Sequence, residues 1–544
     1  MECVVVLQAR QSSTRLPNKV LLKIRGVPVV VLAAKRVMRE KMPLVVAIPD
    51  NSQNHDLKQT LEHYGVPFFA GDECDVLGRV LGSIEHVPDD TVVVRLTADN
   101  VFPDSDFVKN MIQEFRSSHA EYLGVDYQFA HLPYGLGAEV FTAGTIREAG
   151  RKATNAFDRE HVTPWIKRNK SVKYFDLPTI KSDAKCYRAT IDTPADFALV
   201  SASFARVQNP ESASIEELSG NLIISAQEFG ILPGRVINNR WLSNTALGTV
   251  QMGLSYGIAN HVGIPAIDDC RTMISSAINK GLCIIDTAQA YGESEERVGV
   301  ALAGRVDRPL IVTKLLPDIR AKIGAVNHEE YTEYIFKLVK ESQSKLGGRI
   351  DCLMFHRWQD RKNDDGLLGK VFLHIKDLGL IGGIGASVLS PDEFNEAIAA
   401  PDVEFIQFPY NILDHRWESV LQEAHGHSKI LIARSVFLQG LLTKSSEDWP
   451  DWVVNSNLIC DKLDSLVNDF QLGSRLDLCL AYVRASSSIC TVVVGAESPV
   501  QVDEILRLQS RPPLVVSQVR KCQEAFFGLA SERLLDPWRW NESD

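Results

Sequence analysis

The stretch CIIDTAQAYGESEERVGVAL (residues 283–302) carries the pattern that decides the fold of the second half of the chain. It opens with a short apolar run, Cys283–Ala288, that we predict to be a strand, and it places Asp286 and Tyr291 at and just beyond the end of that strand. Similar runs recur at Ala246–Met252, Leu310–Lys314, Cys352–Phe355, Gly382–Ala386, Phe405–Phe408, Ile430–Ala433 and Thr491–Val494. Helical stretches such as TMISSAINKG and YIFKLVKESQSKLGG lie between most of them. Eight strands with crossover helices in roughly 300 residues predict a (β/α)8 TIM barrel.

A doubly wound nucleotide-binding sheet is the alternative for this half. Such a fold normally needs fewer strands and a glycine fingerprint after the first one. The nearest approach to G-x-G-x-x-G is GGIGAS (382–387), which lacks the last glycine. The barrel is therefore the better interpretation.

The first half of the chain shows a different strand and helix rhythm. Short β-branched runs at Val4–Leu7, Leu44–Ile48 and Thr91–Leu96 alternate with helical patterns such as VVVLAAKRVMRE and DVLGRVLGSIEHV. This alternation predicts an α/β domain with a parallel or mixed sheet. The rhythm weakens between about 205 and 240, so we place a first domain at 1–220, a junction at 221–240, the barrel at 241–535 and a tail at 536–544.

Composition excludes several functional classes. The 544 residues hold 69 acidic and 58 Lys or Arg side chains, a formal charge of −11, which argues against nucleic acid or an anionic membrane as the main partner. Ten cysteines without a C-x-x-C pair indicate a reducing compartment. The N-terminus does not resemble a signal peptide, and the longest apolar stretch, 27–34, is far shorter than the ~20 residues of a membrane span. We expect a soluble, cytoplasmic protein.

The ends of the predicted barrel strands carry groups suited to acid–base chemistry. Asp286, Lys314 and His356 stand at strand ends, and Tyr291 lies in the loop after the second strand. A tyrosine hydroxyl, with a pKa near 10, is a poor acid at neutral pH, but a neighbouring Lys lowers that pKa and an Asp holds the Lys charged. A neutral His can then donate a hydrogen bond to a substrate carbonyl. Each residue alone is weak evidence, but the set is coherent.

These segments resemble the aldo-keto reductase family over roughly 295 residues. The matching motifs are LGTVQMG (247–253), IDTAQAYGESEERVGVAL (285–302), VTK (312–314), the strand ending at His356, GIGAS (383–387), QFPYNILDHR (407–416) and VVGAESPVQVDEI (493–505). The resemblance implies Tyr291 as proton donor, Lys314 and Asp286 as its tuners, and His356 as the carbonyl-orienting group. It also implies a nicotinamide cofactor whose carboxamide is held by Ser387 and Gln407.

Three departures from the family pattern concern this cofactor. Val388 stands where an Asn is common, and Arg434 stands where an aromatic residue commonly stacks on the nicotinamide ring. A guanidinium is planar and also stacks, but it brings a charge. The positions that often hold a 2′-phosphate are Gly495, Gln501 and Ile505 here, and none is cationic. NADP is our first expectation by family habit, and NAD is the alternative.

The opening strand runs into a loop suited to a polyanion. This loop, ARQSSTRLPNK (9–19), contains the cations Arg10, Arg15 and Lys19. Cationic side chains and exposed backbone N–H groups neutralise a triphosphate, although a solvated basic loop is the plainer reading of the loop taken alone. Asp99 and Asp192 follow two later predicted strands, and carboxylates beside phosphates suit Mg²⁺. We therefore expect a Mg²⁺–nucleotide site.

These segments resemble sugar nucleotidyltransferases of the cytidylyltransferase type, closest to the spore-coat polysaccharide and Kdo-activating branches. The matching residues are ARQSSTRLPNKVLL (9–22), FAGDECDVLGRV (69–80), VRLTADNVFPDSD (94–106), YGLGAEVF (134–141), DREHVTPWI (158–166) and IDTPADF (191–197). The resemblance implies attack of a sugar oxygen on the α-phosphate of CTP, or of another nucleoside triphosphate, with release of pyrophosphate. Arg10, Arg15 and Lys19 would hold phosphates, while Asp99 and Asp192 would hold Mg²⁺.

This half also departs from its family pattern. Ser12 replaces a usual Gly in the phosphate loop, Ala98 replaces the Gly before Asp99, and Gly137 stands where the closest branch commonly has an acidic residue. Two interpretations remain open for this domain: active nucleotidyl transfer, or a non-catalytic module that binds a nucleotide sugar.

The two resemblances together predict a bifunctional enzyme of surface-glycan precursor synthesis. One domain would activate a sugar with a cytidylyl group, and the other would reduce or oxidise a carbonyl on a related sugar. The alternatives are a reductase with a non-catalytic N-terminal half, and a scaffold that binds nucleotides without turnover. The expected partners are small sugar substrates and the nucleotide, without nucleic acid or membrane, and the oligomeric state is open, with a homodimer as one possibility.

Overall fold

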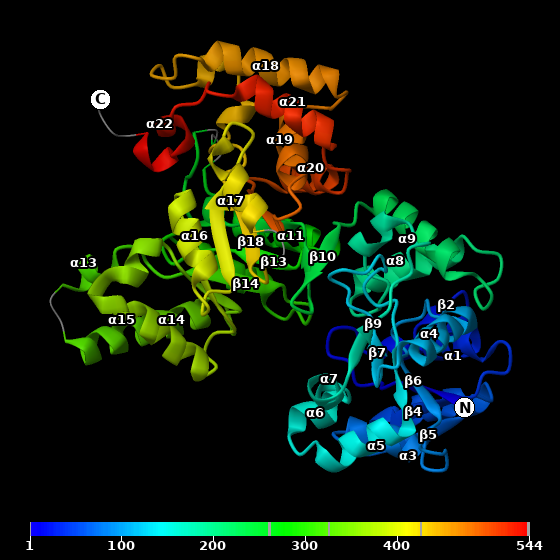
Figure 1. Cartoon of the computed structure of the whole chain (residues 1–544). Coiled ribbons are helices and arrows are strands. Elements are labelled where there is room, and N and C mark those ends of the chain that lie inside the picture. The colour runs from blue at the N-terminus through cyan, green and yellow to red at the C-terminus, as the bar shows by residue number, and fades with distance from the viewer. Residues whose placement is uncertain (1, 259, 261–262, 325–326, 425–426, 541–544) are drawn as a thin grey trace. The chain divides into compact units, whose positions relative to one another are not determined.

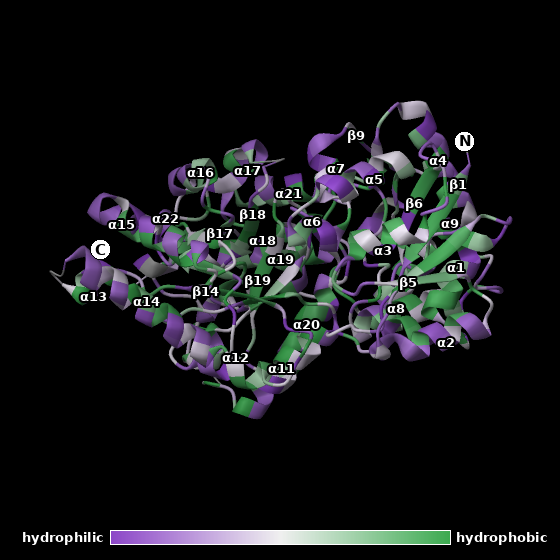
Figure 2. Cartoon of the chain, turned by 90° about the horizontal axis from the view of Figure 1, so that it is seen from below, coloured by the Kyte–Doolittle hydropathy of each residue, from purple (hydrophilic) through white to green (hydrophobic). Residues whose placement is uncertain are grey.

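A computed structural model of the chain describes residues 2–258, 260, 263–324, 327–424 and 427–540 (Figure 1). The chain divides into two compact units, residues 1–229 and 230–544. In Figure 2 the sheet strands of both units are mostly hydrophobic, whereas their outer helices carry hydrophilic residues. Within the described residues, no helix combines the length and apolar character that crossing a bilayer requires.

The first unit is built on a seven-stranded mixed sheet. Its strand order is β5-β4-β1-β6-β8-β7-β9. The strands are β1 (Cys3–Gln8), β4 (Leu44–Pro49), β5 (Phe68–Gly71), β6 (Val92–Thr97), β7 (Tyr122–Gly124), β8 (Glu139–Thr142) and β9 (Val172–Tyr174). β8 runs antiparallel to both β6 and β7, and the other pairs are parallel. The predicted α/β domain with a mixed sheet is confirmed.

Helices and a small hairpin complete this unit. The hairpin is β2 (Lys23–Ile24) with β3 (Val27–Pro28). The helices are α1 (Val29–Met38), α2 (His55–His63), α3 (Val76–Ser83), α4 (Ser105–Ser118), α5 (Ala143–Lys152), α6 (Ala156–His161), α7 (Pro164–Asn169), α8 (Pro194–Ala205) and α9 (Ile215–Phe229). Helix α9 buries Ile215, Leu218, Leu222 and Ala226, which recur at helical spacing and form one face.

The second unit is a closed barrel of eight parallel strands, as predicted. The strands are β12 (Thr245–Gly248), β13 (Ile284–Asp286), β14 (Leu310–Lys314), β15 (Cys352–Phe355), β16 (Ile384–Ser387), β17 (Phe405–Pro409), β18 (Ile430–Arg434) and β19 (Thr491–Gly495). β19 pairs with β12 and closes the barrel. A two-stranded antiparallel hairpin, β10 (Gly234–Ile237) with β11 (Arg240–Ser243), precedes the first strand.

Most barrel strands are separated by helices. These helices are α10 (Val250–Gly253), α11 (Ile267–Asn279), α12 (Ser294–Leu302), α13 (Ile319–Ile323), α14 (His328–Lys345), α15 (Trp358–Asp377, kinked at 363–366), α16 (Pro391–Ala399), α17 (Glu418–Glu423), α18 (Ser456–Asp469), α19 (Arg475–Arg484), α20 (Pro499–Gln509), α21 (Val516–Phe526) and α22 (Glu532–Leu535). The first predicted strand, Ala246–Met252, is wrong beyond Gly248, because α10 follows there.

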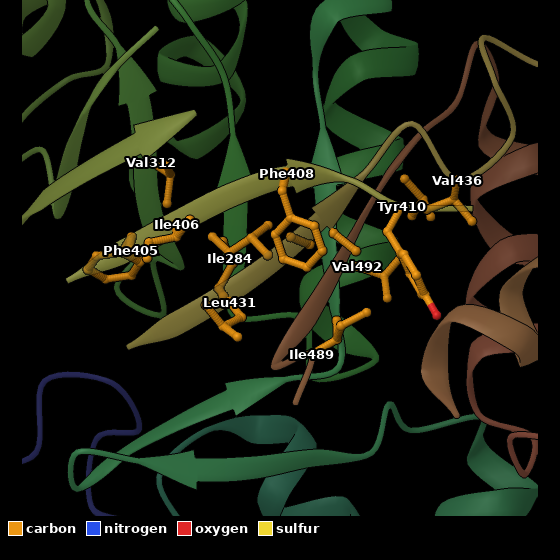
Figure 3. Packing of buried hydrophobic residues seen from close by; sticks show 14 of the residues in the cluster. Ile284, Val312, Phe405, Ile406, Phe408, Tyr410, Leu431, Val436, Ile489 and Val492 are labelled. Atoms are coloured by element: carbon orange, nitrogen blue, oxygen red, sulfur yellow. The ribbon is translucent and has the colours of Figure 1, made fainter. Parts of the chain in front are cut away.

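The apolar core of the barrel joins side chains from strands that are distant in the sequence. Ile284 of β13, Phe408 of β17, Leu431 of β18 and Val492 of β19 belong to one buried cluster (Figure 3). Burying such a side chain stabilises the fold by roughly 1.5–3 kcal/mol relative to leaving it exposed. This packing fixes the strands, and the strand ends in turn fix the polar residues that follow them.

Candidate active sites

Four polar side chains lie at the carboxyl-terminal ends of three neighbouring barrel strands. Asp286 ends β13, Lys314 ends β14 and His356 directly follows β15. Tyr291 lies in the loop after β13, and its backbone N–H donates to the Ala288 carbonyl at 3.0 Å. Because the strands are parallel, these ends meet at one face of the barrel. The structure therefore brings the four predicted residues together.

A buried ion pair forms the centre of this group. The Lys314 Nζ lies 2.8 Å from both carboxylate oxygens of Asp286 and also donates to the Thr287 carbonyl at 3.1 Å and to the Tyr291 hydroxyl at 3.4 Å. Only 1% of the Lys314 side chain is exposed. Burial by itself would lower the pKa of Lys314, but the Asp286 carboxylate and the Tyr291 hydroxyl together outweigh burial, and the pKa is raised. A charged ammonium is thus held against the tyrosine hydroxyl.

His356 completes the group as a neutral side chain. Its ring lies edge-on to the ring of Tyr291, with centroids 6.0 Å apart and an interplanar angle of 89°. Burial, and then the positive charges of Lys314 and Arg434, lower the pKa of His356 to about 3. The buried Nδ1 atom has no hydrogen-bond partner within the part of the chain that the structure describes. At neutral pH the imidazole is therefore uncharged.

The loop that carries Tyr291 packs tightly against the end of α10. A Cβ atom added at Gly253 would lie 1.8 Å from the Tyr291 carbonyl oxygen, closer than any side chain allows. On the other side of the contact, Gly292 has a φ of +57°, a conformation that favours glycine. The two glycines let the backbones approach, and this approach fixes where the Tyr291 side chain begins.

Three of the predicted cofactor residues lie on strands next to the acid–base group. Gln407 of β17 donates from Nε2 to the Asp286 Oδ1 at 2.8 Å. Ser387, at the end of β16, is 4% exposed, and its hydroxyl has no hydrogen-bond partner among the described residues. Arg434, at the end of β18, donates to the Val388 carbonyl and to the Ser435 hydroxyl, both at 3.2 Å. A hydroxyl without a protein partner and a fixed carboxamide beside the tetrad suit a ligand with amide groups, such as nicotinamide.

The two predicted phosphate-end residues occupy the last barrel strand and the helix after it. Gly495 ends β19, and a Cβ atom there would lie 2.3 Å from the Gln251 Oε1. The exposed Gln501 is in the first turn of α20, and its Oε1 accepts the Glu497 backbone N–H at 2.7 Å. Neither residue adds a positive charge for a phosphate.

The first unit has its own polar cluster, centred on Lys19. The Lys19 Nζ donates to the Asp99 Oδ2 at 2.6 Å and to the Asp192 Oδ1 at 2.9 Å, although these carboxylates are far apart in the sequence. Asp99 follows β6, and its carbonyl accepts the Ile191 backbone N–H at 3.0 Å, which aligns the two acidic segments. Burial alone would lower the pKa of Lys19, but Asp99 and Asp192 outweigh it and raise the pKa.

Two arginines add to the positive charge around Asp192. Arg15 lies 3.2 Å from the Asp192 Oδ1, and Arg188 donates to the Asp192 Oδ2 at 2.7 Å. Burial opposes ionisation of Asp192, but Lys19, Arg188 and Arg15 lower its pKa to about 2. Arg10 is exposed and makes no ion pair within the described residues. The structure thus gathers four of the five predicted residues and leaves Arg10 at the edge.

Tyrosine side chains extend this cluster. A Cβ atom at Gly137 would lie 2.4 Å from the Tyr127 hydroxyl oxygen, so Tyr127 fills the space that a longer side chain at this position would use. The Tyr127 ring lies edge-on to Tyr134, with centroids 5.1 Å apart, and the Arg188 guanidinium lies 5.2 Å from the centroid of Tyr134. The Tyr127 ring therefore occupies the space beside Gly137, where the related branch commonly has an acidic residue. It connects to Asp192 through Tyr134 and Arg188.

Arg188 and Asp196 are contributors that the sequence interpretation missed. Arg188 donates to the Asp196 Oδ1 at 2.9 Å, and Asp196 forms a capping box with Thr193 at the start of α8. The signal was present, because Thr followed three residues later by an acidic residue marks a helix N-terminus. The cap explains why the loop with Asp192 ends where it does.

The cluster offers two carboxylates to a cation. Oxygen ligands of this kind suit Mg²⁺, which commonly takes one or two carboxylates plus phosphate oxygens. No group of three or more His, Cys, Asp or Glu side chains able to hold a metal occurs in the described ranges. The residues therefore fit a metal that arrives with a phosphate ligand rather than one bound by protein groups alone.

Comparisons with known proteins cover both units. A family model described as "Aldo/keto reductase family" matches residues 246–526, and one described as "Cytidylyltransferase" matches residues 4–224. The chain is 30% identical over 228 residues to the spore coat polysaccharide biosynthesis protein SpsF of Bacillus subtilis, which covers 40% of this chain and 92% of SpsF.

Two further similarities concern the barrel. The chain is 26% identical over 266 residues to the NADH-specific methylglyoxal reductase of Escherichia coli, covering 43% of this chain and 81% of that protein. Among solved structures, the holo form of aldo-keto reductase AKR11C1 from Bacillus halodurans is 22% identical, with a TM-score of 0.46, covering 56% of this chain and 99% of that chain.

Proposed function

The chain belongs to the aldo/keto reductase family through residues 246–526 and contains a cytidylyltransferase domain at residues 4–224, and from this we propose that it is a bifunctional enzyme. The barrel reduces or oxidises a carbonyl on a sugar-like substrate with NADP or NAD. The first unit transfers a nucleotidyl group, with CTP the expected donor, to a sugar. The match to a spore coat polysaccharide protein supports a role in surface-glycan precursor synthesis.

The observation that carries the reductase assignment is the contact chain from Asp286 through Lys314 to Tyr291. The carboxylate keeps the ammonium charged, and the ammonium lies 3.4 Å from the tyrosine hydroxyl, where it stabilises the phenolate left when the proton leaves. In reduction the Tyr291 hydroxyl gives its proton to the carbonyl oxygen, while neutral His356 donates a hydrogen bond to the same oxygen. The cofactor supplies the hydride that the carbonyl carbon accepts.

We assign Ser387 and Gln407 to the cofactor's carboxamide. Ser387 has a hydroxyl without a partner, and Gln407 is fixed by its bond to Asp286. The choice between NADP and NAD depends on the positions of Gly495 and Gln501, where neither side chain supplies a cation for a 2′-phosphate. NADP is common in the family, whereas the neutral residues at these two positions and the similarity to an NADH-specific reductase support NAD.

The observation that carries the transferase assignment is the convergence of Arg15, Lys19, Asp99 and Asp192. In this proposal Lys19 and Arg15, with Arg10 at the edge of the loop, bind the triphosphate. Asp99 and Asp192 would hold Mg²⁺ together with the nucleotide, and the ion would supply positive charge that offsets the charge of the departing pyrophosphate. A sugar oxygen attacks the α-phosphate, the new P–O bond forms, and the bond to pyrophosphate breaks.

Each half has a direct test. For the barrel, oxidation of NADPH or NADH with a panel of sugar aldehydes and ketones is measured for wild type and Tyr291→Phe. We expect a loss of at least 10²-fold in the variant, the usual contribution of a positioned acid. Equal rates in the two proteins would remove Tyr291 from the mechanism.

For the first unit, pyrophosphate release is measured with CTP, Mg²⁺ and a panel of sugar acids and sugar phosphates. We expect release by wild type and not by Asp99→Ala. If no nucleotide supports release while the protein still binds one, the domain is a non-catalytic binding module and the chain is a reductase only.

A further inference from the structure

A second group of polar side chains lies on the sheet of the first unit, close to the carboxyl end of β6. Arg95 of β6 stands directly opposite Glu139 of β8, and Gln8 ends the neighbouring strand β1. Arg95 donates from Nε to the Gln8 Oε1 and from Nη1 to the Glu139 Oε2. Two residues back along each strand, Val93 and Phe141 share this face and belong to a buried apolar cluster. The face therefore changes from apolar to polar toward the end of β6.

Glu139 uses all of its acceptor capacity on its neighbours. Its Oε1 accepts the hydroxyls of Tyr122 and Thr163, each at 2.7 Å. The same oxygen lies 3.0 Å from the Lys167 Nζ, and the other oxygen accepts from Arg95. Burial raises the pKa of Glu139, but the two cations and the two hydroxyls outweigh burial and lower it to about 2. Because a carboxylate accepts about four such contacts, Glu139 fixes its partners and has no capacity left for a ligand.

Two cations share this single carboxylate. Within the described residues, Glu139 is the one carboxylate in ion-pair contact with either Arg95 or Lys167, so these three groups carry a net charge of +1. The next cation on α7, Arg168, pairs with Asp158 instead. The Arg95 Nη2 has no hydrogen-bond partner in the same ranges and remains accessible to solvent. A guanidinium edge with free N–H donors therefore lies beside a partly exposed ammonium.

This arrangement is fixed before any ligand arrives. Two side-chain bonds orient the Arg95 guanidinium, and a fixed planar fork loses little freedom when it binds a carboxylate or a phosphate. Thr163, which donates to Glu139, follows Val162, whose φ of +72° is rare for a β-branched residue. Such strain persists only where the surrounding structure holds it, and it is found mostly at functional sites.

The polar group lies near the proposed metal carboxylates. Asp99 follows Arg95 by four residues, so their Cα atoms are at most about 14 Å apart. Tyr127 connects the two places, because burial first, and then Tyr134, Glu139 and Asp99, raise its pKa. Both carboxylates are thus close enough to Tyr127 to oppose a charge on its phenol. A sugar-sized molecule bound at Arg95 can therefore present a hydroxyl toward the cation site at Asp99.

We propose that Arg95 and Lys167 bind an anionic group, a carboxylate or a phosphate, on the sugar that accepts the nucleotidyl group. This inference rests on the proposed transferase function and deepens it by naming the charge of the acceptor. The site offers N–H donors and one surplus positive charge, whereas its carboxylate is saturated, so it suits an acidic sugar better than a neutral one. The triphosphate is left to Arg15 and Lys19.

Binding of matched probes tests this preference without turnover. Dissociation constants of the full chain for glucuronate, glucose 6-phosphate and glucose are measured by titration calorimetry with saturating CTP, or another nucleoside triphosphate that binds, and no Mg²⁺. The nucleotide occupies the triphosphate residues, so the probes report on the remaining site. We expect a charged probe to bind roughly 10- to 100-fold more tightly than glucose, the usual worth of hydrogen bonds to a charged group. Tighter binding of glucuronate assigns a carboxylate, and tighter binding of the ester assigns a phosphate.

Three variants locate the effect. Arg95→Gln should remove most of the difference in affinity between the charged probe and glucose. Lys167→Gln, at a more exposed position, should reduce this difference by about two- to fivefold. Lys173→Gln is the matched control, because Lys173 is 45% exposed against 43% for Lys167 but lies on the opposite face of the sheet, paired with Glu114. This control should leave all three dissociation constants unchanged.

Each outcome has one meaning. If wild type binds the nucleotide but binds glucose as tightly as both charged probes, the inference is wrong while the transferase function stands. An unchanged ratio in Arg95→Gln and Lys167→Gln also overturns it, and the exposed Lys167 variant gives this result even if Arg95→Gln does not fold. A loss of nucleotide affinity in Arg95→Gln as large as the loss for the charged probe would assign Arg95 to the triphosphate and overturn it too. If wild type binds no nucleoside triphosphate, the proposed transferase function itself fails.

Discussion

Replacing Asp286 with Asn should leave a buried ammonium without its counter-ion. Lys314 is 1% exposed, and both of its shortest contacts, at 2.8 Å, are to the Asp286 carboxylate. Breaking a buried pair from one side typically costs about 3–5 kcal/mol, because the remaining charge stays desolvated. We therefore expect Asp286→Asn to lower the free energy of unfolding of the barrel by that amount at pH 7.

The double variant Asp286→Asn/Lys314→Met should recover most of this loss. Once the ammonium is also removed, no unpaired charge remains, and an apolar side chain of similar length fills the space. Carbonyl reduction should stay at least 10²-fold below wild type in both variants, because Tyr291 has lost the charge that stabilises its phenolate. Recovery of stability without recovery of activity separates the structural role of the pair from its chemical role.

The pH dependence has a definite sign. The folded-state pKa of Lys314 is raised above its unfolded value near 10.4, so the pair's contribution is fully present below that pH and is lost as pH rises through the folded value. In Asp286→Asn the lysine pKa falls instead, so the variant becomes more stable as pH rises and Lys314 deprotonates. The difference in unfolding free energy between the two proteins should narrow with increasing pH.

Urea unfolding followed by tryptophan fluorescence measures these quantities. Trp165 is the one tryptophan of the eight that precedes residue 230, so the signal reports mainly on the barrel. Asp307→Asn is the control: its partner Arg305 is 22% exposed and can turn to water, so we expect a loss of at most about 1 kcal/mol. An equal loss in Asp286→Asn and Asp307→Asn would refute the argument that burial of the ammonium sets the cost.

Three other predictions concern single features. Burial holds the pKa of His356 at about 3, below its unfolded value. The contribution of His356 to the free energy of unfolding should therefore decline by up to about 1.4 kcal/mol per pH unit as pH falls below 6.5. In urea titrations between pH 6.5 and 5, His356→Gln should flatten this slope. Lys19→Met should tighten Mn²⁺ binding in the absence of nucleotide by about tenfold or more, because the ammonium no longer occupies both carboxylates. Lys23→Met, at an exposed position, should leave Mn²⁺ binding unchanged. Equal Mn²⁺ affinities of wild type and Lys19→Met, measured by electron paramagnetic resonance, would contradict this prediction. Gly137→Ala should destabilise the first unit by about 1–3 kcal/mol, because the added methyl group contacts the Tyr127 hydroxyl. In thermal melts the double variant Tyr127→Phe/Gly137→Ala should regain part of the lost stability. No recovery in the double variant would show that this contact does not set the cost.

The barrel and its acid–base residues are predictable because the information is local. Each strand is a short apolar run, and the group that matters stands at its end, so finding the run also finds the residue. Asp286, Lys314 and His356 were located this way, without knowledge of any contact between them. The end of the first strand was misplaced, because the stop after Gly248 depends on the packing of Gly253 against the Tyr291 loop.

What the sequence does not reveal depends on contacts between distant segments. No local pattern shows that Lys19 bridges Asp99 and Asp192, or that the Tyr127 hydroxyl fills the space beside Gly137. Such features arise from tertiary packing, which a pattern of strands and helices does not specify.

The central claim is that one chain carries two independent active sites, and a crossed assay tests it most directly. Pyrophosphate release and nicotinamide oxidation are measured on the same full-length preparations of wild type, Asp99→Ala and Tyr291→Phe. The account predicts that Asp99→Ala loses only pyrophosphate release and that Tyr291→Phe loses only the redox reaction. If either variant retains both activities at the wild-type level, or if wild type shows only one activity with any nucleotide and carbonyl tested, the claim of two working sites is contradicted.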